Sequence, residues 1–128
     1  MKKVVYWLEV ILWCGIIFFF SSIPDLKIKQ LGFLDFVLRK IAHMTEYCIL
    51  VILFFRAFKV SLSYENYRKK GYFLSIFLSF LYAIFDEIHQ YFVPGRHFAL
   101  TDILIDTVGI ILGIFLWDKI FNKSKLEI

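Results

Sequence analysis

The chain has 128 residues, a length typical of one domain, and 60% of them are hydrophobic, with a mean hydropathy of +0.72. Soluble domains are about 45–50% apolar, so this composition excludes an ordinary soluble protein. It predicts an all-α integral membrane protein that forms a single domain over residues 1–128. The net charge of +4 does not indicate a nucleic-acid partner, because the basic residues flank the apolar segments.

Four apolar segments are long enough to cross a bilayer as helices, and we predict them at about residues 4–20, 41–58, 72–93 and 98–117. We expect the first segment to be retained as a membrane helix, because no A-x-A-like pair of small residues follows it as in a cleaved signal peptide. Residues 33–40 mix apolar and charged side chains, which predicts a short interfacial helix before the second span. Residues 59–71 are predicted to form a polar, basic loop.

Small residues on the predicted spans bear on how the helices pack. Gly109 and Gly113 form a GxxxG on the fourth span, which permits close approach of another helix. Packing within one chain and formation of a homo-oligomer both stay open. Cys14 and Cys48 fall inside apolar segments, where we expect them to be buried as free thiols and not to form a disulfide framework.

Polar and ionisable side chains gather where the second span begins, where the third ends and where the fourth begins. The candidate functional residues are His43, Glu46, Tyr47, Asp86, Glu87, Gln90, Arg96, Asp102 and Asp106. A charged group at membrane depth costs about 2.5–3.5 kcal/mol on insertion scales, so such residues indicate a functional site. Asp86 and Gln90 share a helix face, as do Asp102 and Asp106. Arg96 stands in the Pro-Gly turn between these pairs, and its planar fork could bridge carboxylates.

The distribution of Lys and Arg predicts the orientation. More of these residues fall on the side that holds both termini and the middle loop than on the other side. The positive-inside rule therefore predicts that both termini are cytoplasmic. The candidate functional residues would then converge near the outer interface of the membrane.

The candidate site holds five carboxylates against one or two cations, so some carboxylates must face water, share protons or bind a cation. An enzyme could use His43 or a carboxylate as general base and Arg96 to hold a phosphate, with Ser21 or Ser22 as the nearest nucleophile. A metal site could draw on His43, His89 and several carboxylates, since Asp86 and His89 stand at i,i+3, but no recognised ligand signature completes it, so we expect no metal and no cofactor. An ion carrier, a ligand-binding site and a purely structural hydrogen-bond network are the other readings.

Several short motifs occur in a fixed order along the chain. They are Ser21-Ser22-x-Pro24, Lys40-x-x-His43-x-x-Glu46-Tyr47, Asp86-Glu87-x-x-Gln90, Pro94-Gly95-Arg96 and Asp102-x-x-x-Asp106-Thr107-x-Gly109-x-x-x-Gly113. In these motifs the chain resembles the VanZ-like family of small bacterial membrane proteins, over about residues 18–113. It departs from many relatives at Asp106, where they have Asn. The resemblance implies a multi-pass protein of the bacterial cell membrane and the family's phenotype, low-level resistance to the glycopeptide antibiotic teicoplanin.

The residues and the resemblance together predict a cell-envelope protein whose outward polar site binds an amphiphilic ligand among membrane lipids. Expected ligands are a lipid-linked cell-wall precursor or a lipoglycopeptide such as teicoplanin, in which case the protein would confer antibiotic resistance. The alternative is an intramembrane enzyme that acts on a polyprenyl phosphate or on a lipid-linked cell-wall precursor. The sequence leaves open whether the protein is an enzyme.

Overall fold

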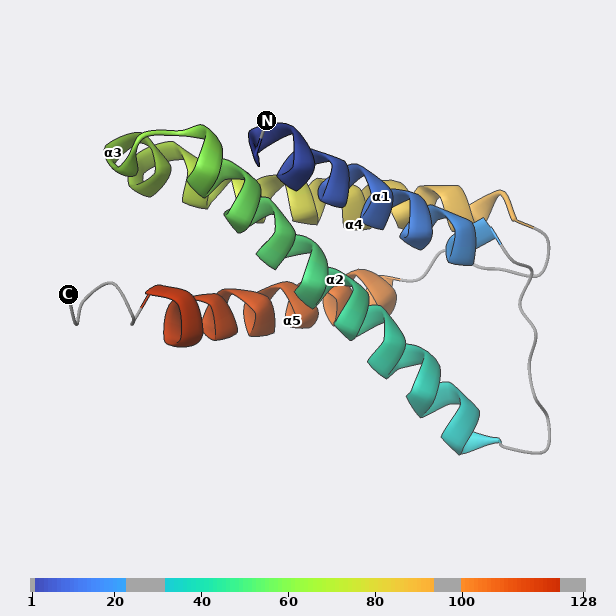
Figure 1. Ribbon diagram of the computed structural model, residues 1–128. Coiled ribbons are helices and arrows are strands. Elements are labelled where there is room, and N and C mark those ends of the chain that lie inside the picture. The colour runs from blue at the N-terminus through green and yellow to red at the C-terminus, as the bar shows by residue number, and fades with distance from the viewer. Residues whose placement is uncertain (1, 23–31, 94–99, 123–128) are drawn as a thin grey trace.

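Four long helices make up most of the computed structural model, which describes residues 2–22, 32–93 and 100–122 (Figure 1). They are α1 (Lys2–Ser22), α2 (Phe33–Ser61), α4 (Tyr72–Tyr91) and α5 (Leu100–Leu116). A short helix α3 (Tyr64–Asn66) and a π-helical turn η1 (Tyr67–Gly71) lead into α4, and a second π-helical turn η2 (Trp117–Asn122) extends α5. No strand occurs in these residues. The four helical stretches are each long and apolar enough to cross a membrane, which confirms the predicted all-α fold with four transmembrane helices.

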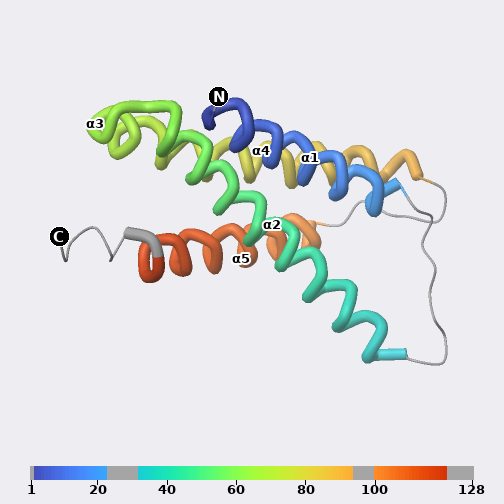
Figure 2. Tube along the Cα trace, viewed as in Figure 1, coloured from blue at the N-terminus to red at the C-terminus, as the bar shows by residue number. Residues whose placement is uncertain are grey.

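The predicted short interfacial helix is not a separate element. Residues 33–40 form the first turns of α2, which runs without a break from Phe33 to Ser61. At 1.5 Å per residue this helix is about 44 Å long, whereas the hydrocarbon core of a bilayer is about 30 Å thick. Figures 1 and 2 show α2 crossing the other helices obliquely, an orientation that brings a helix of this length closer to the thickness of the bilayer.

The predicted loop at residues 59–71 is wrong over most of its length, because the chain leaves the helical conformation only briefly after α2. Leu62 is extended, with φ −110° and ψ 156°. Ser63 then caps α3 by accepting a hydrogen bond from the backbone N–H of Asn66 at 3.2 Å. The basic residues of the predicted loop lie in η1, which continues the helix into α4. Residues 59–71 are therefore polar because most of them are exposed at the end of the bundle, and not because they form a loop.

A buried face of α2 forms the centre of the core, where this helix packs against α1, α4 and α5. Phe55 lies between two aromatic rings, with centroid distances of 4.9 Å to Tyr72 and 5.5 Å to Trp117. The indole N–H of Trp117 donates a hydrogen bond to the Tyr67 hydroxyl at 2.7 Å, which joins η2 to η1. These contacts close the end of the bundle that carries α3.

The two glycines of the GxxxG motif pack against α2 of the same chain. A Cβ atom added at Gly109 would meet the backbone of Met44, and one added at Gly113 would lie 2.7 Å from the carbonyl oxygen of Cys48. The motif therefore serves packing within one chain, one of the two readings left open by the sequence. Cys48 and Cys14 are free thiols, as predicted, but each is only partly buried.

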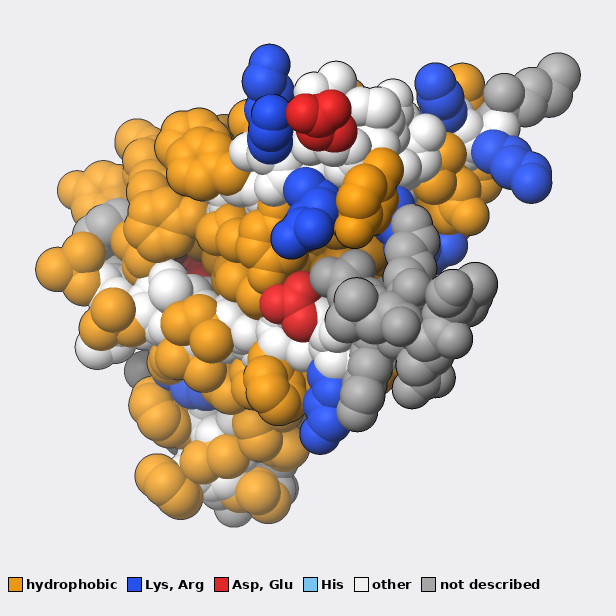
Figure 3. All heavy atoms as spheres, turned by 90° about the vertical axis from the view of Figure 1, so that its left-hand side faces the viewer, with side chains coloured by type: hydrophobic (Ala, Val, Ile, Leu, Met, Phe, Trp, Pro, Cys, Tyr) orange, Lys and Arg blue, Asp and Glu red, His pale blue; other side chains and the backbone are white. Residues whose placement is uncertain are grey.

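The outer surface of the bundle is rich in large apolar side chains, as expected for helices that face lipid. On α1 alone, Ile11 and Leu12 are 65% and 67% exposed. Figure 3 looks at the end of the molecule where α3 and η2 lie, and Lys and Arg side chains stand out there among hydrophobic ones. The ionisable groups of the candidate site lie at the opposite end.

Candidate functional site

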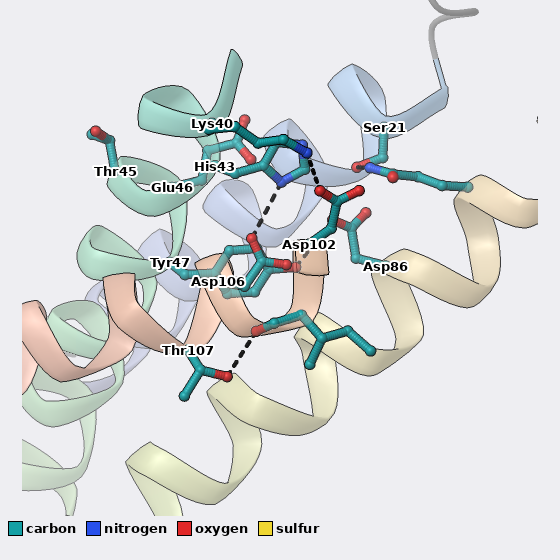
Figure 4. A network of polar contacts seen from close by, with 12 residues as sticks. Ser21, Lys40, His43, Thr45, Glu46, Tyr47, Asp86, Asp102, Asp106 and Thr107 are labelled. Carbon is teal, nitrogen blue, oxygen red and sulfur yellow. Dashed lines mark hydrogen bonds and ion pairs between the residues drawn. The ribbon is translucent and has the colours of Figure 1, made fainter. Parts of the chain in front are cut away.

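The candidate site forms where the last turns of α1 and α4 meet the first half of α2 and the start of α5. Its centre is a group that we call the His–carboxylate cluster: His43 from α2, Asp86 and Glu87 from α4, and Asp106 from α5. One nitrogen or oxygen of each residue lies within 4.8 Å of one such atom of every other. Residues that are up to 63 positions apart in the sequence thus converge on one point (Figure 4).

His43 and Asp106 connect α2 to α5. The Nδ1 atom of His43 lies 3.2 Å from Oδ1 of Asp106, whose side chain is completely buried. Gly109 lies three residues after Asp106, on the same face of α5, and allows this helix to approach the backbone of α2. The close approach at Gly109 therefore places the carboxylate of Asp106 against the imidazole of His43.

Tyr47 orients Asp86 from the next turn of α2. Its hydroxyl donates a hydrogen bond to Oδ2 of Asp86 at 3.1 Å, and both residues are buried. The same hydroxyl lies 3.4 Å from the carbonyl oxygen of Tyr82. This pairing holds a carboxylate of α4 toward the interior of the bundle.

Glu87 is fully buried, with a relative exposure of 0%. Within the part of the chain that the structure describes, neither of its carboxylate oxygens has a hydrogen-bond partner, and the same is true of Oδ2 of Asp106. An ionised carboxylate without a partner costs several kcal/mol in a protein interior. The His–carboxylate cluster therefore has acceptor atoms that a proton, a cation or a ligand must satisfy.

Further polar contacts surround the cluster. Lys40 forms an ion pair with Asp102, and both side chains are partly exposed (Figure 4). At the end of α1, the amide of Gln90 donates to the Ser21 hydroxyl at 3.3 Å. The ring of His89 stacks on Phe18 with a centroid distance of 4.2 Å. These contacts tie all four long helices together at this end.

The structure brings most of the predicted site residues together. Tyr47 contacts the His–carboxylate cluster directly, through Asp86. Gln90 and Asp102 lie at the same end of the bundle, where they contact Ser21 and Lys40, respectively. Glu46 lies beside His43 on α2 (Figure 4). The backbone carbonyl of Glu46 also accepts a hydrogen bond from the indole of Trp13 at 2.9 Å. Arg96 lies outside the described residues, so its role as a bridge between the acidic pairs stays a prediction.

Lys40, Ser22 and His89 are not among the nine candidate functional residues, although the sequence analysis considered Ser22 as a nucleophile and His89 as a metal ligand. Lys40 pairs with Asp102, and it precedes His43 by three positions, a spacing that puts both side chains on one helix face. Ser22 and His89 are in contact, with 2.9 Å between Oγ and Nε2. The Ser-Ser pair at the end of an apolar helix was visible in the sequence, but its partner 67 residues away was not.

Chemically, the site presents one imidazole and several carboxylates inside a membrane-spanning bundle of four helices. Fold and site thus define a small multi-pass membrane protein with a buried polar centre. The chain matches the family model described as VanZ/LLP1 over residues 6–122, nearly its whole length, and it belongs to this family. No curated protein and no solved structure gives a match to the chain.

Proposed function

We propose that the protein binds the polar head of an amphiphilic cell-envelope ligand at the His–carboxylate cluster, while the apolar tail of the ligand stays in the surrounding lipid. The observation that carries this proposal is the set of buried acceptor atoms on Glu87 and Asp106 that have no partner within the described residues. Sugar and peptide head groups carry hydroxyl, amide and ammonium groups, which donate hydrogen bonds to such oxygens.

The surface next to the cluster suits a ligand that is partly apolar. Phe85 and Ile88 flank the acidic pair on α4 and are each 49% exposed, and Leu104 lies between the two aspartates of α5 and is 64% exposed. On both helices the polar side chains therefore point inward while their neighbours face lipid. A ligand that enters from the membrane would meet apolar surface first and polar groups after it.

We infer that this end of the bundle faces the outside of a bacterial cell, with both termini in the cytoplasm. The positive-inside rule supports this orientation, because Arg68, Lys69 and Lys70 are exposed in η1 at the opposite end. A ligand of the outer leaflet, such as a lipid-linked cell-wall precursor or a lipid-tailed glycopeptide, would then reach the site.

Antibiotic tolerance tests this proposal. Teicoplanin has an acyl chain that partitions into the outer leaflet, and vancomycin lacks one. Expression in a susceptible Gram-positive host should therefore raise the minimal inhibitory concentration of teicoplanin more than that of vancomycin. The Glu87→Gln variant should lose this effect at equal abundance, whereas Glu65→Gln, whose side chain is 76% exposed at the other end of the bundle, should keep it. Equal protection by parent and Glu87→Gln would show that the cluster is scaffold, and no protection by the parent would refute the ligand class.

An intramembrane enzyme is the second candidate, and the contact between Ser22 and His89 is the observation in its favour. A serine next to a histidine is the arrangement of an activated nucleophile. The Ser22 hydroxyl, however, donates its hydrogen to the carbonyl oxygen of Phe18 at 2.8 Å, so His89 would have to donate to Ser22 and could not act as its base in this arrangement. This contact is why we rank binding above catalysis. Loss of the teicoplanin effect in Ser22→Ala, with the protein folded and abundant, would favour the enzyme.

A further inference from the structure

The four side chains of the His–carboxylate cluster have the composition of a metal-binding site. They supply one imidazole nitrogen and three carboxylate groups, all from helices whose positions are fixed by packing. We propose that they bind one divalent first-row metal ion, Mn²⁺ or Zn²⁺. From the sequence we expected no metal, and the geometry described here is the reason for the different proposal.

The distances within the cluster are compatible with a single ion. Metal–ligand bonds of about 2.0–2.2 Å place the ligand atoms of a tetrahedral site about 3.4 Å apart. In an octahedral site neighbouring ligand atoms are about 3 Å apart and opposite ones about 4.2 Å apart. The contact between Nδ1 of His43 and Oδ1 of Asp106, at 3.2 Å, matches two neighbouring ligands. The other pairs lie within 4.8 Å, so small rotations of the carboxylates would bring all four residues onto one ion.

Unsatisfied atoms provide a second, independent argument. Both oxygens of Glu87 and Oδ2 of Asp106 are buried without a partner among residues 2–22, 32–93 and 100–122. A cation that bound there would satisfy these three acceptors together. Tyr47 adds a contact of the kind that orients metal ligands, because its hydroxyl fixes Asp86 through Oδ2.

Charge also favours a divalent ion. Three ionised carboxylates around a neutral imidazole carry a charge of −3, and the nearby Lys40 is already paired with Asp102. An ion of charge +2 removes most of this repulsion in a single step, whereas protons would have to neutralise the carboxylates one at a time. With a metal bound, all three carboxylates could stay ionised, which is the form that coordinates a metal.

The kind of ligand narrows the choice of ion. Imidazole suits Zn²⁺ and other first-row ions, carboxylate suits Mn²⁺, and the absence of thiolate from the cluster disfavours Cu⁺. Mg²⁺ prefers an all-oxygen octahedron and gives up its water reluctantly, which does not fit a buried histidine site. Mn²⁺ and Zn²⁺ remain as the ions to test.

The test uses the full-length protein, purified in detergent, stripped with a chelator and then dialysed separately against Mn²⁺, Zn²⁺ or Mg²⁺. Elemental analysis should find one Mn²⁺ or Zn²⁺ per chain, and calorimetry should show binding that weakens at least about tenfold in Glu87→Gln. The matched control Glu65→Gln replaces an exposed glutamate and should bind like the parent. Asp106→Asn is a second cluster variant, and circular dichroism checks that each variant retains its helices.

Electron paramagnetic resonance of the Mn²⁺-loaded parent gives a readout that does not depend on any variant. It should show nitrogen coupling from one imidazole, as expected if His43, the histidine of the cluster, is a ligand. The proposal would be overturned if the parent bound no stoichiometric metal, or if both cluster variants bound the metal as tightly as the parent. It would also be overturned if the parent bound Mg²⁺ as tightly as Mn²⁺ or Zn²⁺. An infrared carboxylic-acid band that persists with metal present and disappears in Glu87→Gln would overturn it as well, because it would show that a proton neutralises Glu87. The metal and the ligand proposed above draw on the same acceptor atoms of Glu87 and Asp106, but their tests are separate, since metal binding is measured without any envelope lipid or antibiotic.

Discussion

Replacement of Gly109 by alanine tests the packing that positions the site. The added Cβ would lie 2.9 Å from Cα of Met44 and closer still to its carbonyl oxygen. Carbon atoms in ordinary contact are about 3.5–4.0 Å apart, so α5 would have to move away from α2 by roughly 0.6–1 Å. Because the opposing atoms belong to the backbone of a helix, no change of rotamer can relieve the clash.

Overpacking of this kind costs about 1–3 kcal/mol, and we expect Gly109→Ala to lower the free energy of unfolding by this amount. In a soluble helix, replacement of glycine by alanine would recover up to about 1 kcal/mol through helix propensity. In a membrane the helices remain helical even when they separate from one another, because their backbone hydrogen bonds are kept. The gain from the higher helix propensity of alanine should therefore be small. The displacement should also lengthen the contact between His43 and Asp106.

Equilibrium unfolding in mixed micelles, followed by circular dichroism and tryptophan fluorescence, measures the loss. Gly15→Ala is the matched control, because a Cβ atom at Gly15 would meet nothing within 4 Å. The two variants make the same chemical change on helices of the same bundle. If Gly109→Ala proves as stable as Gly15→Ala, the close packing of α2 on α5 is refuted.

Two further predictions concern orientation and the cluster. In a cysteine-free background, a cysteine introduced at Pro94 should react with an impermeant thiol reagent in intact cells, and one at Asn66 should react only after permeabilisation; the opposite pattern would place the site in the cytoplasm. Tyr47→Phe removes the hydroxyl that donates to Asp86 and should destabilise the protein by about 1–3 kcal/mol in the same unfolding assay. Tyr91→Phe, at a position that is 63% exposed, is its control, and equal stability of the two variants would show that the buried hydroxyl contributes nothing.

The four spans were predictable because the length of an apolar run is itself the physical requirement for crossing a bilayer. The continuous helix from Tyr64 to Tyr91 was not, since its first turns are polar. Charged residues such as Arg68 are typical of loops, yet they also occupy the ends of membrane helices where side chains reach water. The local signal that could have revealed the helix is Ser63, whose hydroxyl caps it.

The candidate site was predictable as a set of residues but not as an arrangement. Ionisable groups in apolar runs stand out, which identified His43, Asp86, Glu87 and Asp106 from the sequence alone. Their meeting depends on the register of α2 on α5, which backbone contacts at Gly109 determine. The spacing of residues within one helix does not predict which residues meet between three helices, and for this reason the sequence showed no metal-ligand signature.

The division of the cluster among three helices has a consequence for biosynthesis. Asp86 and Glu87 leave the ribosome about 20 residues before Asp106, so at about 5–20 residues per second α4 is made roughly one to four seconds before its partner on α5. During this interval α2 has already been made and can supply His43 and Tyr47, but the side of the cluster that α5 forms is still missing. We therefore expect the insertion of α4 into lipid to depend on the synthesis of α5, because Glu87 is fully buried only when the bundle is complete.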